Sequence, residues 1–221
     1  MSDSTHLPIV LIGGGGHAAV LVDILLSQGR DIVAVVSPDE IDTRTIFSGI
    51  ERFSQEKDIL QFSSDGVVLV NGIGMVPKSN LRKTINEYYL SLGYRFESVV
   101  SGSAIISSFA NLGAGVQILN GAIVQAGANI GPHTIINTAA IVEHDCEIGP
   151  YNHISPSATI CGGVATSLGV YIGAGAVITP NLKLGLGCVV GAGTTILNCL
   201  SDFSIQTGQP PRKPYFLEKC E

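Results

Sequence analysis

From Val100 onward, an aliphatic side chain recurs at every sixth residue of the chain. Of the seventeen positions counted by sixes from Val100 to Ile196, sixteen hold valine, isoleucine or leucine, and the exception is Thr166. The residue four places after each aliphatic is mostly small: Ala122, Ala128, Thr134, Ala140, Cys146, Ala158, Ala176, Cys188 and Thr194. A period of six fits neither an α-helix nor an alternating β-strand. It is typical of a solenoid in which three hexads form one triangular coil.

A solenoid of this kind predicts which side chains are buried. The first and fifth residues of each hexad point inward, and each stacks on its counterpart one coil, or eighteen residues, along the chain. Neighbouring coils lie at the usual strand spacing of about 4.8 Å. Glycines that directly follow the aliphatic residue, such as Gly131 and Gly149, are expected to allow tight corners. The outer faces of the coils are flat, so we expect several chains to associate.

The first half of the chain follows a different pattern, in which apolar runs alternate with helical periodicity. Apolar runs at residues 7–12, 31–36 and 66–72 predict three strands, and residues 18–28, 51–61 and 78–92 are predicted to form helices. Alternation of this kind is typical of a parallel βαβαβ unit. We therefore expect an α/β domain at residues 1–98 and a β-helix with a C-terminal tail at residues 99–221.

The composition excludes several classes of protein. The net charge is −6 and the basic residues form no cluster, which argues against nucleic acid as a partner. No run of eighteen apolar residues is free of charge or glycine, so we expect no membrane-spanning helix. The N-terminal residues lack the pattern of a secretory signal, and the five cysteines form no CxxC pair. We therefore expect a cytoplasmic protein with reduced thiols.

Four consecutive glycines, Gly13 to Gly16, stand between the first predicted strand and the first predicted helix, in the stretch GGGGHA. Backbone amides at a helix N-terminus can bind a phosphate, so this loop predicts a phosphate site. Gly13, Gly15 and Ala18 fit the dinucleotide fingerprint G-x-G-x-x-A, yet no acidic residue ends the second strand and only one half-site is present. One nucleotide fits this domain better than a dinucleotide. A tight turn without a ligand is the alternative.

Three histidines lie within the hexads, at positions His133, His144 and His153. Their spacings of eleven and nine residues are not multiples of the coil length, and zinc needs about three converging ligands. A metal hydratase like the γ-class carbonic anhydrases is therefore the weaker alternative, and we expect no metal. His144 occupies the third hexad position, which points outward, and Asp145 or Glu143 could orient it as a general base.

Cys146 lies beside this histidine in the stretch IVEHDCEIGPYNH but occupies the fifth, inward-pointing position of its hexad. A thiol buried among apolar side chains is inert, so we expect no covalent intermediate on this cysteine. Direct transfer between two bound substrates is the remaining route. His133 is interpreted as a structural residue.

The hexads, the GGGGHA loop and the stretch NTAAIVEHDCEIGPYNHISP together resemble the hexapeptide-repeat acyltransferases, and among them the sugar acetyltransferases of the sialic acid and bacillosamine branch. The resemblance runs from Ile9 to about Pro214. It implies an α/β half-Rossmann domain followed by a left-handed parallel β-helix, assembly into homotrimers, and acetyl-CoA as the acetyl donor. His144 with Asp145 matches the catalytic pair of the family.

The resemblance also implies two sets of ligand-binding residues. The residues that match the nucleotide-sugar site are Gly14, Gly15, Gly16, His17, Ser37, Asn71 and Gly72. The residues that match the acetyl-CoA site are His153, Gly162, Gly173, Gly191, Pro210, Arg212 and Lys213. The last three belong to the tail TGQPPRKP, which resembles the family ending GxPAK, with Pro211 where alanine is usual. A proline-rich end that only stops the solenoid is the alternative for this tail.

We therefore expect an acetyl-CoA-dependent N-acetyltransferase that modifies the 4-amino group of a nucleotide-linked 4-amino-4,6-dideoxy sugar, in the biosynthesis of surface glycans such as the O-antigen of lipopolysaccharide. An O-acetyltransferase that acts on sialic acid or a related sugar shares the same motifs. A non-catalytic trimer that binds nucleotide sugars is the alternative from another class. The sequence leaves open whether the nucleotide is UDP, GDP or dTDP, and which stereochemistry the sugar has.

Overall fold

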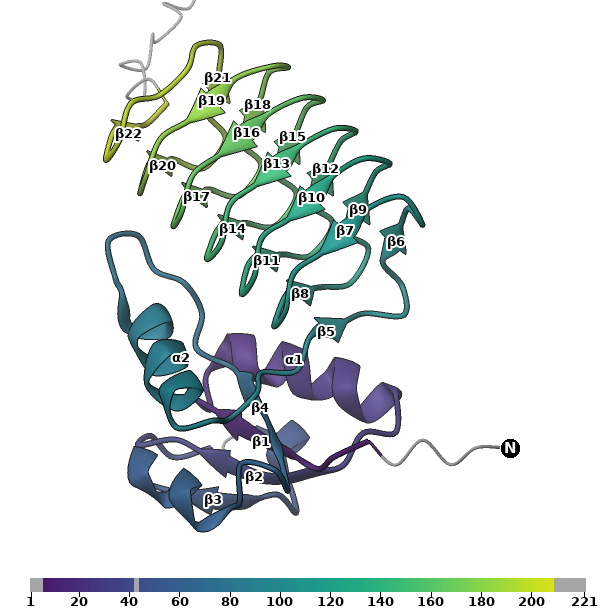
Figure 1. Cartoon of the computed structure of the whole chain (residues 1–221), viewed down its shortest axis with the longest axis vertical. Coiled ribbons are helices and arrows are strands. Elements are labelled where there is room, and N and C mark those ends of the chain that lie inside the picture. Colours follow the sequence, from purple (N-terminus) through teal and green to yellow (C-terminus); the bar gives the residue numbers. More distant parts are fainter. Residues whose placement is uncertain (1–5, 42–43, 209–221) are drawn as a thin grey trace, which may run out of the picture.

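The computed structural model describes residues 6–41 and 44–208, which form an α/β domain and a prism of stacked coils (Figure 1). The α/β domain holds a parallel sheet of four strands in the order β3-β2-β1-β4, here named sheet A. Its elements, with η marking a 3₁₀ helix, are β1 (Ile9–Ile12), α1 (Gly16–Ser27), β2 (Ile32–Val36), η1 (Thr45–Phe47), β3 (Glu51–Phe53), η2 (Glu56–Gln61), β4 (Val68–Asn71) and α2 (Leu81–Ser91). The predicted parallel α/β domain is confirmed. None of the helices in the described ranges has the length and apolar character needed to cross a bilayer.

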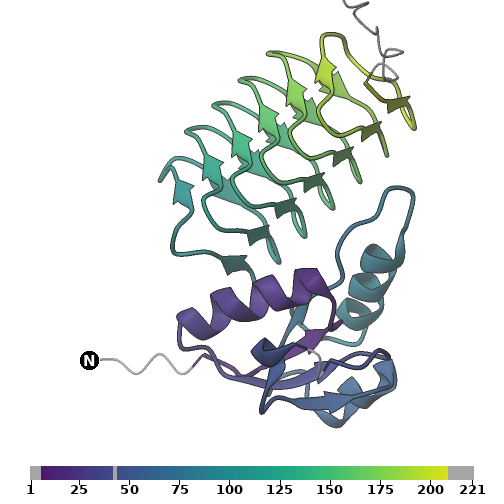
Figure 2. The same cartoon turned by 180° about the vertical axis from the view of Figure 1, so that it is seen from behind.

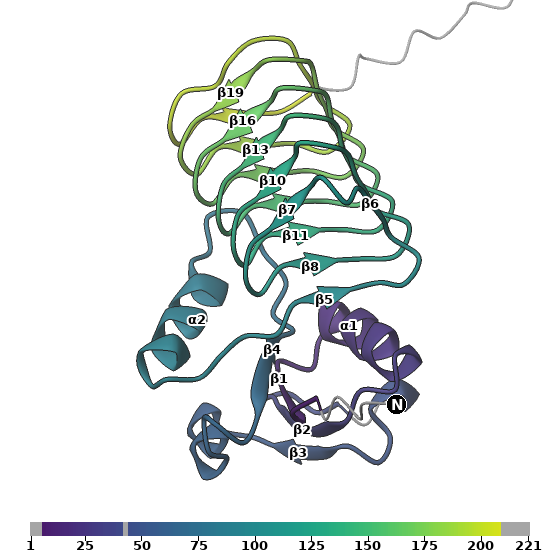
Figure 3. The same ribbon diagram turned by 45° about the vertical axis from the view of Figure 1, so that its right-hand side comes forward.

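The strands β1 and β2 carry only apolar side chains, as expected for a sheet that is covered on both faces. Alternate residues of β1 pack on opposite sides: Ile9 and Leu11 join the apolar cluster of α1, whereas Val10 and Ile12 join the cluster of α2. The α1 cluster also contains Val99 of the first coil. The core of the α/β domain therefore continues into the prism, and α1 lies between sheet A and the first coil (Figure 3).

The predicted helix at residues 51–61 is wrong in its first half. Residues Glu51–Phe53 form β3, which pairs in parallel with β2 at the edge of sheet A. A helix begins only at Glu56, behind a capping box in which the Gln55 amide donates to Asp58 Oδ2 at 3.0 Å and the Gln55 side chain caps the Asp58 amide. The capping box fixes the start of the helix, so the apolar spacing over these residues overestimated its length.

The predicted left-handed parallel β-helix is confirmed: three sheets of short parallel strands enclose a triangular core (Figures 1 and 2). Sheet B contains β5 (Val99–Val100), β8 (Gln117–Ile118), β11 (Ile135–Ile136), β14 (His153–Ile154), β17 (Tyr171–Ile172), β20 (Val189–Val190) and β22 (Ile205–Gln206). Sheet C contains β6 (Ile105–Ile106), β9 (Ile123–Val124), β12 (Ile141–Val142), β15 (Thr159–Ile160), β18 (Val177–Ile178) and β21 (Thr195–Ile196). Sheet D contains β7 (Asn111–Leu112), β10 (Asn129–Ile130), β13 (Glu147–Ile148), β16 (Ala165–Thr166) and β19 (Lys183–Leu184).

From Ile118 to Ile196 the first hexad position is buried throughout and the fifth nearly so, as the period predicts, whereas Leu112 in the first coil is 38% exposed. Val142, Ile160 and Cys146 are each 0% exposed and lie in one apolar cluster that continues along the prism. Thr166, the exception in the aliphatic row, is also buried, and its Oγ1 accepts a hydrogen bond from the Gly149 amide at 3.0 Å. The core tolerates this hydroxyl because the hydroxyl has a partner.

The glycine that follows each aliphatic residue has a different role from the predicted one. The left-handed backbone that turns each corner lies at the fourth hexad position, as at Gly127 (φ +78°) and Asp145 (φ +58°). A Cβ on Gly131 would lie 2.6 Å from the backbone of the next coil, and a Cβ on Gly149 would overlap the backbone at Ser167. These glycines therefore allow adjacent coils to stack closely, while the corners turn two residues later.

The three sheets of the prism present different outer surfaces. Sheet D is polar outside, where Asn111 donates to Asn129 at 2.7 Å and Asn129 donates to Glu147 at 2.5 Å. Sheet B carries the α/β domain against its first strands (Figure 3). Sheet C has a mostly apolar outer row, which consists of Ile105, Ile123, Ile141, Thr159, Val177 and Thr195. Because Ile105 is 65% exposed, this row begins in an uncovered apolar surface.

Candidate active site

A cavity of about 500 Å³ opens at the carboxyl ends of β1, β2 and β4. A crevice at this edge of an open α/β sheet is the usual place for a ligand. Most of the residues predicted to hold the nucleotide line it, namely Gly14, Gly15, Gly16, His17, Ser37 and Gly72. The structure therefore brings together residues from three separate loops that the sequence assigned to one site.

The glycines of the first loop differ in what they contact. A Cβ on Gly14 would overlap Ile41 Cγ2, so packing alone requires this glycine. A Cβ on Gly15 or Gly16 would meet no atom within 4 Å, although both residues stand at the N-terminus of α1. Packing thus explains the glycine at position 14, whereas Gly15 and Gly16 are free to present bare backbone amides to an anion.

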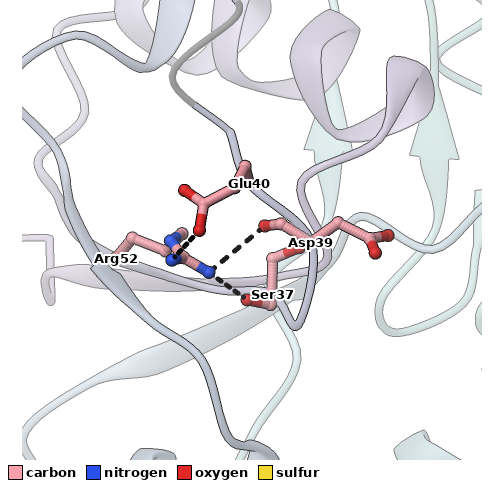
Figure 4. A network of polar contacts seen from close by, with 4 residues as sticks. All are labelled: Ser37, Asp39, Glu40 and Arg52. Carbon is pink, nitrogen blue, oxygen red and sulfur yellow. Dashed lines mark hydrogen bonds and ion pairs between the residues drawn. The ribbon is translucent and has the colours of Figure 1, made fainter.

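The loop after β2, which carries Ser37, is held in place by Arg52 of β3 (Figure 4). The Arg52 guanidinium donates to the carbonyl oxygens of Ser37 at 3.2 Å and Asp39 at 3.4 Å, and it pairs with Glu40 Oε1 at 2.7 Å. The edge strand of sheet A therefore fixes one wall of the cavity. This support was missed from the sequence, because β3 lies where a helix was predicted.

Asn71, which was also predicted to bind the nucleotide, does not line this cavity. Its buried Nδ2 donates to Asn86 Oδ1 at 2.7 Å and to the Arg82 carbonyl at 3.2 Å, both on α2. Its Oδ1 accepts a hydrogen bond from the Ile73 amide at 2.9 Å. The side chain thus shapes the loop after β4, which forms the opposite wall of the cavity.

His17 connects the cavity to the β-helix. Its Nε2 lies 2.7 Å from Gln117 Oε1 on β8, and Gln117 Nε2 donates to the Asn71 carbonyl at 2.7 Å. Burial and, second, the charge of nearby Arg82 lower the pKa of His17 to about 4, so its ring is neutral at pH 7. Gln117 and Arg82 were not predicted from the sequence, because contacts between segments as far as 100 residues apart leave no periodic signal.

His153 lies in β14 of sheet B and is 7% exposed. Its Nε2 lies 3.0 Å from Asn137 Nδ2, and its ring makes an edge contact with Tyr171 at a centroid distance of 5.2 Å. Burial and, second, repulsion from His17 when that ring is protonated lower the pKa of His153 to about 4. Two of the three predicted site histidines, His17 and His153, therefore lie near each other between the domains, where both are neutral at pH 7.

Asn137 and His133 complete the polar contacts of this region. Asn137 lies in the stretch NTAA that the sequence singled out, although no role was predicted for its side chain. The His133 ring is buried between Phe96, at a centroid distance of 5.6 Å, and Tyr151, at 4.9 Å. Burial and then Arg82 lower the pKa of His133 to about 4. These contacts give His133 the packed surroundings of a structural residue.

His144 and Asp145 form a pair on the corner between β12 and β13, that is, between sheets C and D. His144 Nδ1 lies 2.8 Å from Asp145 Oδ2, and the two side chains are 64% and 74% exposed. When Nδ1 donates to the carboxylate, Nε2 is left to accept a proton. A Cβ on Gly162, one coil along, would lie 2.5 Å from His144 Cε1 and Nε2. The structure thus brings His144, Asp145 and Gly162 together.

The pair on the corner is separated from the cavity of its own chain. His144 stands between sheets C and D, whereas the cavity and His153 belong to the side of sheet B. In Figure 1 the α/β domain lies beneath the first coils and beside sheet B, away from the corner that follows β12. One chain by itself therefore does not place His144 at the cavity of its own α/β domain.

The remaining residues predicted to bind acetyl-CoA lie in the later coils or beyond them. Gly173 is buried, and a Cβ on it would lie 2.5 Å from the Ala192 amide nitrogen, so coil stacking already requires this glycine. Gly191 is partly buried beside Thr207. Pro210, Arg212 and Lys213 lie outside the described residues.

The surroundings of Cys146 and the grouping of possible metal ligands bear on the two alternative chemistries. The Cys146 thiol is 0% exposed, and burial raises its pKa to about 11, which keeps the thiol protonated and inert. Within residues 6–41 and 44–208, no three or more His, Cys, Asp and Glu side chains are grouped so that they could hold a metal ion.

The chain consists of a half-Rossmann domain joined to a left-handed β-helix, an architecture that it shares with acetyltransferases that use acetyl-CoA. Residues 8–89 match the family model described as the PglD N-terminal domain. A search of curated protein sequences found no match.

The chain is similar to solved structures over nearly its whole length. The acetyltransferase domain of PglB from Neisseria gonorrhoeae, solved with acetyl coenzyme A, is 27% identical over 93% of this chain and 98% of that one, with a TM-score of 0.80. PerB from Caulobacter crescentus, solved with CoA and GDP-perosamine, is 29% identical over 91% of this chain and 94% of that one, with a TM-score of 0.81. These comparisons confirm the resemblance to sugar acetyltransferases of the hexapeptide-repeat type.

Proposed function

We propose that the chain is an acetyl-CoA-dependent N-acetyltransferase that acetylates the 4-amino group of a nucleotide-linked 4-amino-4,6-dideoxy sugar. The observation that carries this proposal is the exposed His144–Asp145 pair on the edge of a β-helix, joined to a domain with a nucleotide-sized cavity. The relatives support the same substrates, since PglB was solved with acetyl coenzyme A and PerB with GDP-perosamine. A place in surface glycan biosynthesis, in the cytoplasm, follows from this activity.

The nucleotide is proposed to occupy the cavity of the α/β domain. The amides of Gly15 and Gly16 would bind its phosphates at the N-terminus of α1. His17 lines the same cavity and contacts the β-helix through Gln117, so the sugar would extend from the phosphates toward the prism.

His144 is proposed to act as the general base. Asp145 holds Nδ1 at 2.8 Å, which leaves Nε2 to take the proton from the sugar amine as the amine attacks the thioester carbonyl. The tetrahedral intermediate would be stabilised by a nearby donor such as the Gly162 amide. Collapse of this intermediate expels the CoA thiolate. Because Cys146 is buried, the acetyl group would pass directly from CoA to the amine.

A homotrimer would bring the base to the nucleotide. Sheet C offers a mostly apolar outer row, with Ile105 65% exposed, and His144 stands at the edge of this sheet. A neighbouring copy that covers sheet C would place its own cavity and His153 near His144 of the first copy.

Ile105→Lys and Ile141→Lys together should convert the assembly to monomers in light scattering. A variant that stays trimeric would exclude sheet C as the interface.

Acetyl transfer from acetyl-CoA to UDP-, GDP- and dTDP-linked 4-amino sugars tests the proposed reaction. Transfer to sialic acid in place of these amines would favour the O-acetyltransferase, and failure to bind acetyl-CoA would favour a non-catalytic nucleotide-sugar protein.

His144→Ala should lower kcat by a factor of about 10²–10⁴, the usual loss for a general base. Asp145→Asn should also lower kcat, whereas Glu143→Gln should not, since Asp145 makes the contact to Nδ1. Near-wild-type turnover in His144→Ala would refute the mechanism.

A further inference from the structure

Two glycines in neighbouring coils face the His144–Asp145 pair. A Cβ on Gly162, in the coil after His144, would lie 2.5 Å from both Cε1 and Nε2 of the imidazole. A Cβ on Gly127, in the coil before, would overlap Asp145 Oδ1. The imidazole thus lies over one glycine and the carboxylate over the other, with the Nδ1 to Oδ2 contact of 2.8 Å between them.

The backbone of the β-helix does not itself require glycine at these two positions. Gly162 occupies the third hexad position, which elsewhere holds residues such as Ala126 and Leu168. Gly127 occupies the fourth position, where the left-handed corner also accepts Ala139 with φ +55° and Ser157 with φ +57°. The coil geometry therefore tolerates a side chain at both places. At Gly127 and Gly162 the space above the glycine is occupied by a side chain of the His144–Asp145 pair, much as Asn181 occupies the space above Gly163.

We propose that Gly127 and Gly162 are positioning residues. Because neither has a side chain, they leave a space, here called the seat, in which the His144 imidazole and the Asp145 carboxylate meet. The inference rests on the proposed function, in which His144 Nε2 takes the proton of the amine. Both facing groups are the ends of exposed side chains, so an added methyl group would displace them rather than disrupt the core. A shift of about 1 Å in a catalytic group is enough to lower a rate about 100-fold.

Gly162→Ala tests the seat of the imidazole, with Gly102→Ala as the matched control. Gly102 also stands at the third hexad position, and a Cβ on it would meet no atom within 4 Å. We expect Gly162→Ala to lower kcat by about 10- to 100-fold with little change in KM or Tm, and Gly102→Ala to change none of them. The Gly162 amide is retained in this variant, so loss of the proposed oxyanion donor is not the cause.

Gly127→Ala tests the seat of the carboxylate, with Gly121→Ala as the matched control. Both glycines have a left-handed backbone, with φ +78° at Gly127 and φ +68° at Gly121, so alanine introduces the same backbone strain in each. Only at Gly127 does the new Cβ meet a side chain, since a Cβ on Gly121 would be in open space. The kcat of Gly127→Ala is therefore expected to fall well below that of Gly121→Ala.

A readout without substrate separates this inference from the proposed function. Long-range ¹H–¹⁵N NMR of the histidine rings at about pH 8, where an imidazole is neutral, reports which nitrogen carries the proton. His144, assigned by comparison with His144→Ala, should carry its proton on Nδ1 in the wild type and in the control variants, and should become a mixture of tautomers in Gly127→Ala and Gly162→Ala. If the tautomer of His144 is the same in all four glycine variants, the seat is refuted, whatever substrate the enzyme uses. A changed tautomer in a protein that acetylates none of the sugars would support the seat and refute the proposed function.

Discussion

Lowering the pH from 7 to 5 is expected to destabilise the fold through the histidines buried between the domains. Burial, followed by nearby charge, lowers the pKa of His17 and of His153 from 6.5 to about 4. The Arg82 cation contributes to the lowered pKa of both rings, and also to that of the buried His133, which burial lowers to about 4. A proton on His153, which is 7% exposed, would therefore add a second positive charge where little solvent is present.

The direction of the effect follows from the pKa of each histidine in the folded chain and its pKa in the unfolded chain. Above pH 6.5 the rings are neutral in the folded and in the unfolded chain, so they do not change the free energy of unfolding. Between pH 6.5 and about 4 only the unfolded chain binds the protons, and stability falls by about 1.4 kcal/mol per pH unit for each ring. At pH 5 the loss is about 2 kcal/mol for each of His133 and His153, which are both 7% exposed, and the partly exposed His17 adds at most about the same. Below about pH 4 the loss stops growing.

Urea denaturation at pH 7 and pH 5, followed by far-UV circular dichroism, measures this loss. A decrease of about 4–6 kcal/mol is large beside the roughly 5–15 kcal/mol by which folded proteins are usually stable. His153→Gln removes one titrating ring while keeping a polar side chain in β14, so its pH dependence should be smaller by about 2 kcal/mol. Carboxylates titrate in both proteins and cancel in the comparison. Equal losses in the wild type and in His153→Gln would refute the argument that His153 is buried in its neutral form.

Three further predictions follow from the core and from the chemistry. Thr166→Val should lower the free energy of unfolding by about 1–3 kcal/mol in thermal denaturation, because the Gly149 amide loses its acceptor, Thr166 Oγ1, at 3.0 Å. Thr166→Ser keeps the hydroxyl and should lower this free energy by less. Ile160→Ala should lower it by about 2–5 kcal/mol in urea denaturation, since this side chain is 0% exposed in the core; an effect below about 1 kcal/mol would mean that the coil is loosely packed. EDTA should leave acetyl transfer unchanged, and a loss of activity that zinc restores would contradict the metal-free mechanism.

The outward position of His144 could be predicted because it depends only on the phase of the repeat. Val142 and Cys146 are both 0% exposed, so the third residue of the same hexad points away from the core. The repeat also predicted the pairing of strands eighteen residues apart, such as Ile136 with Ile154. The glycine loop was predicted to bind a phosphate because it opens the first helix, whereas Ser37 and Gly72 were assigned to the same site by the family resemblance; all of them line one cavity.

Predictions failed where a short segment takes its conformation from distant partners. Glu51–Phe53 form a strand because they pair with β2 at an open edge, and a run of three residues has too short a pattern to show this beforehand. The glycines after the aliphatic residues were assigned to corners, because the sequence records that they are glycines but not which backbone approaches them from the next coil.

The sequence by itself determined that this protein contains a β-helix, which residues fill it, and that a glycine loop opens the first helix of an α/β domain. These features are local, since each hexad or strand repeats the same pattern of side chains. Only the tertiary structure decided that His17 reaches Gln117, a residue 100 positions away, and that Gly127 and Gly162 face the His144–Asp145 pair. The physical reason is that such contacts depend on how the α/β domain packs on sheet B and how one coil lies on the next.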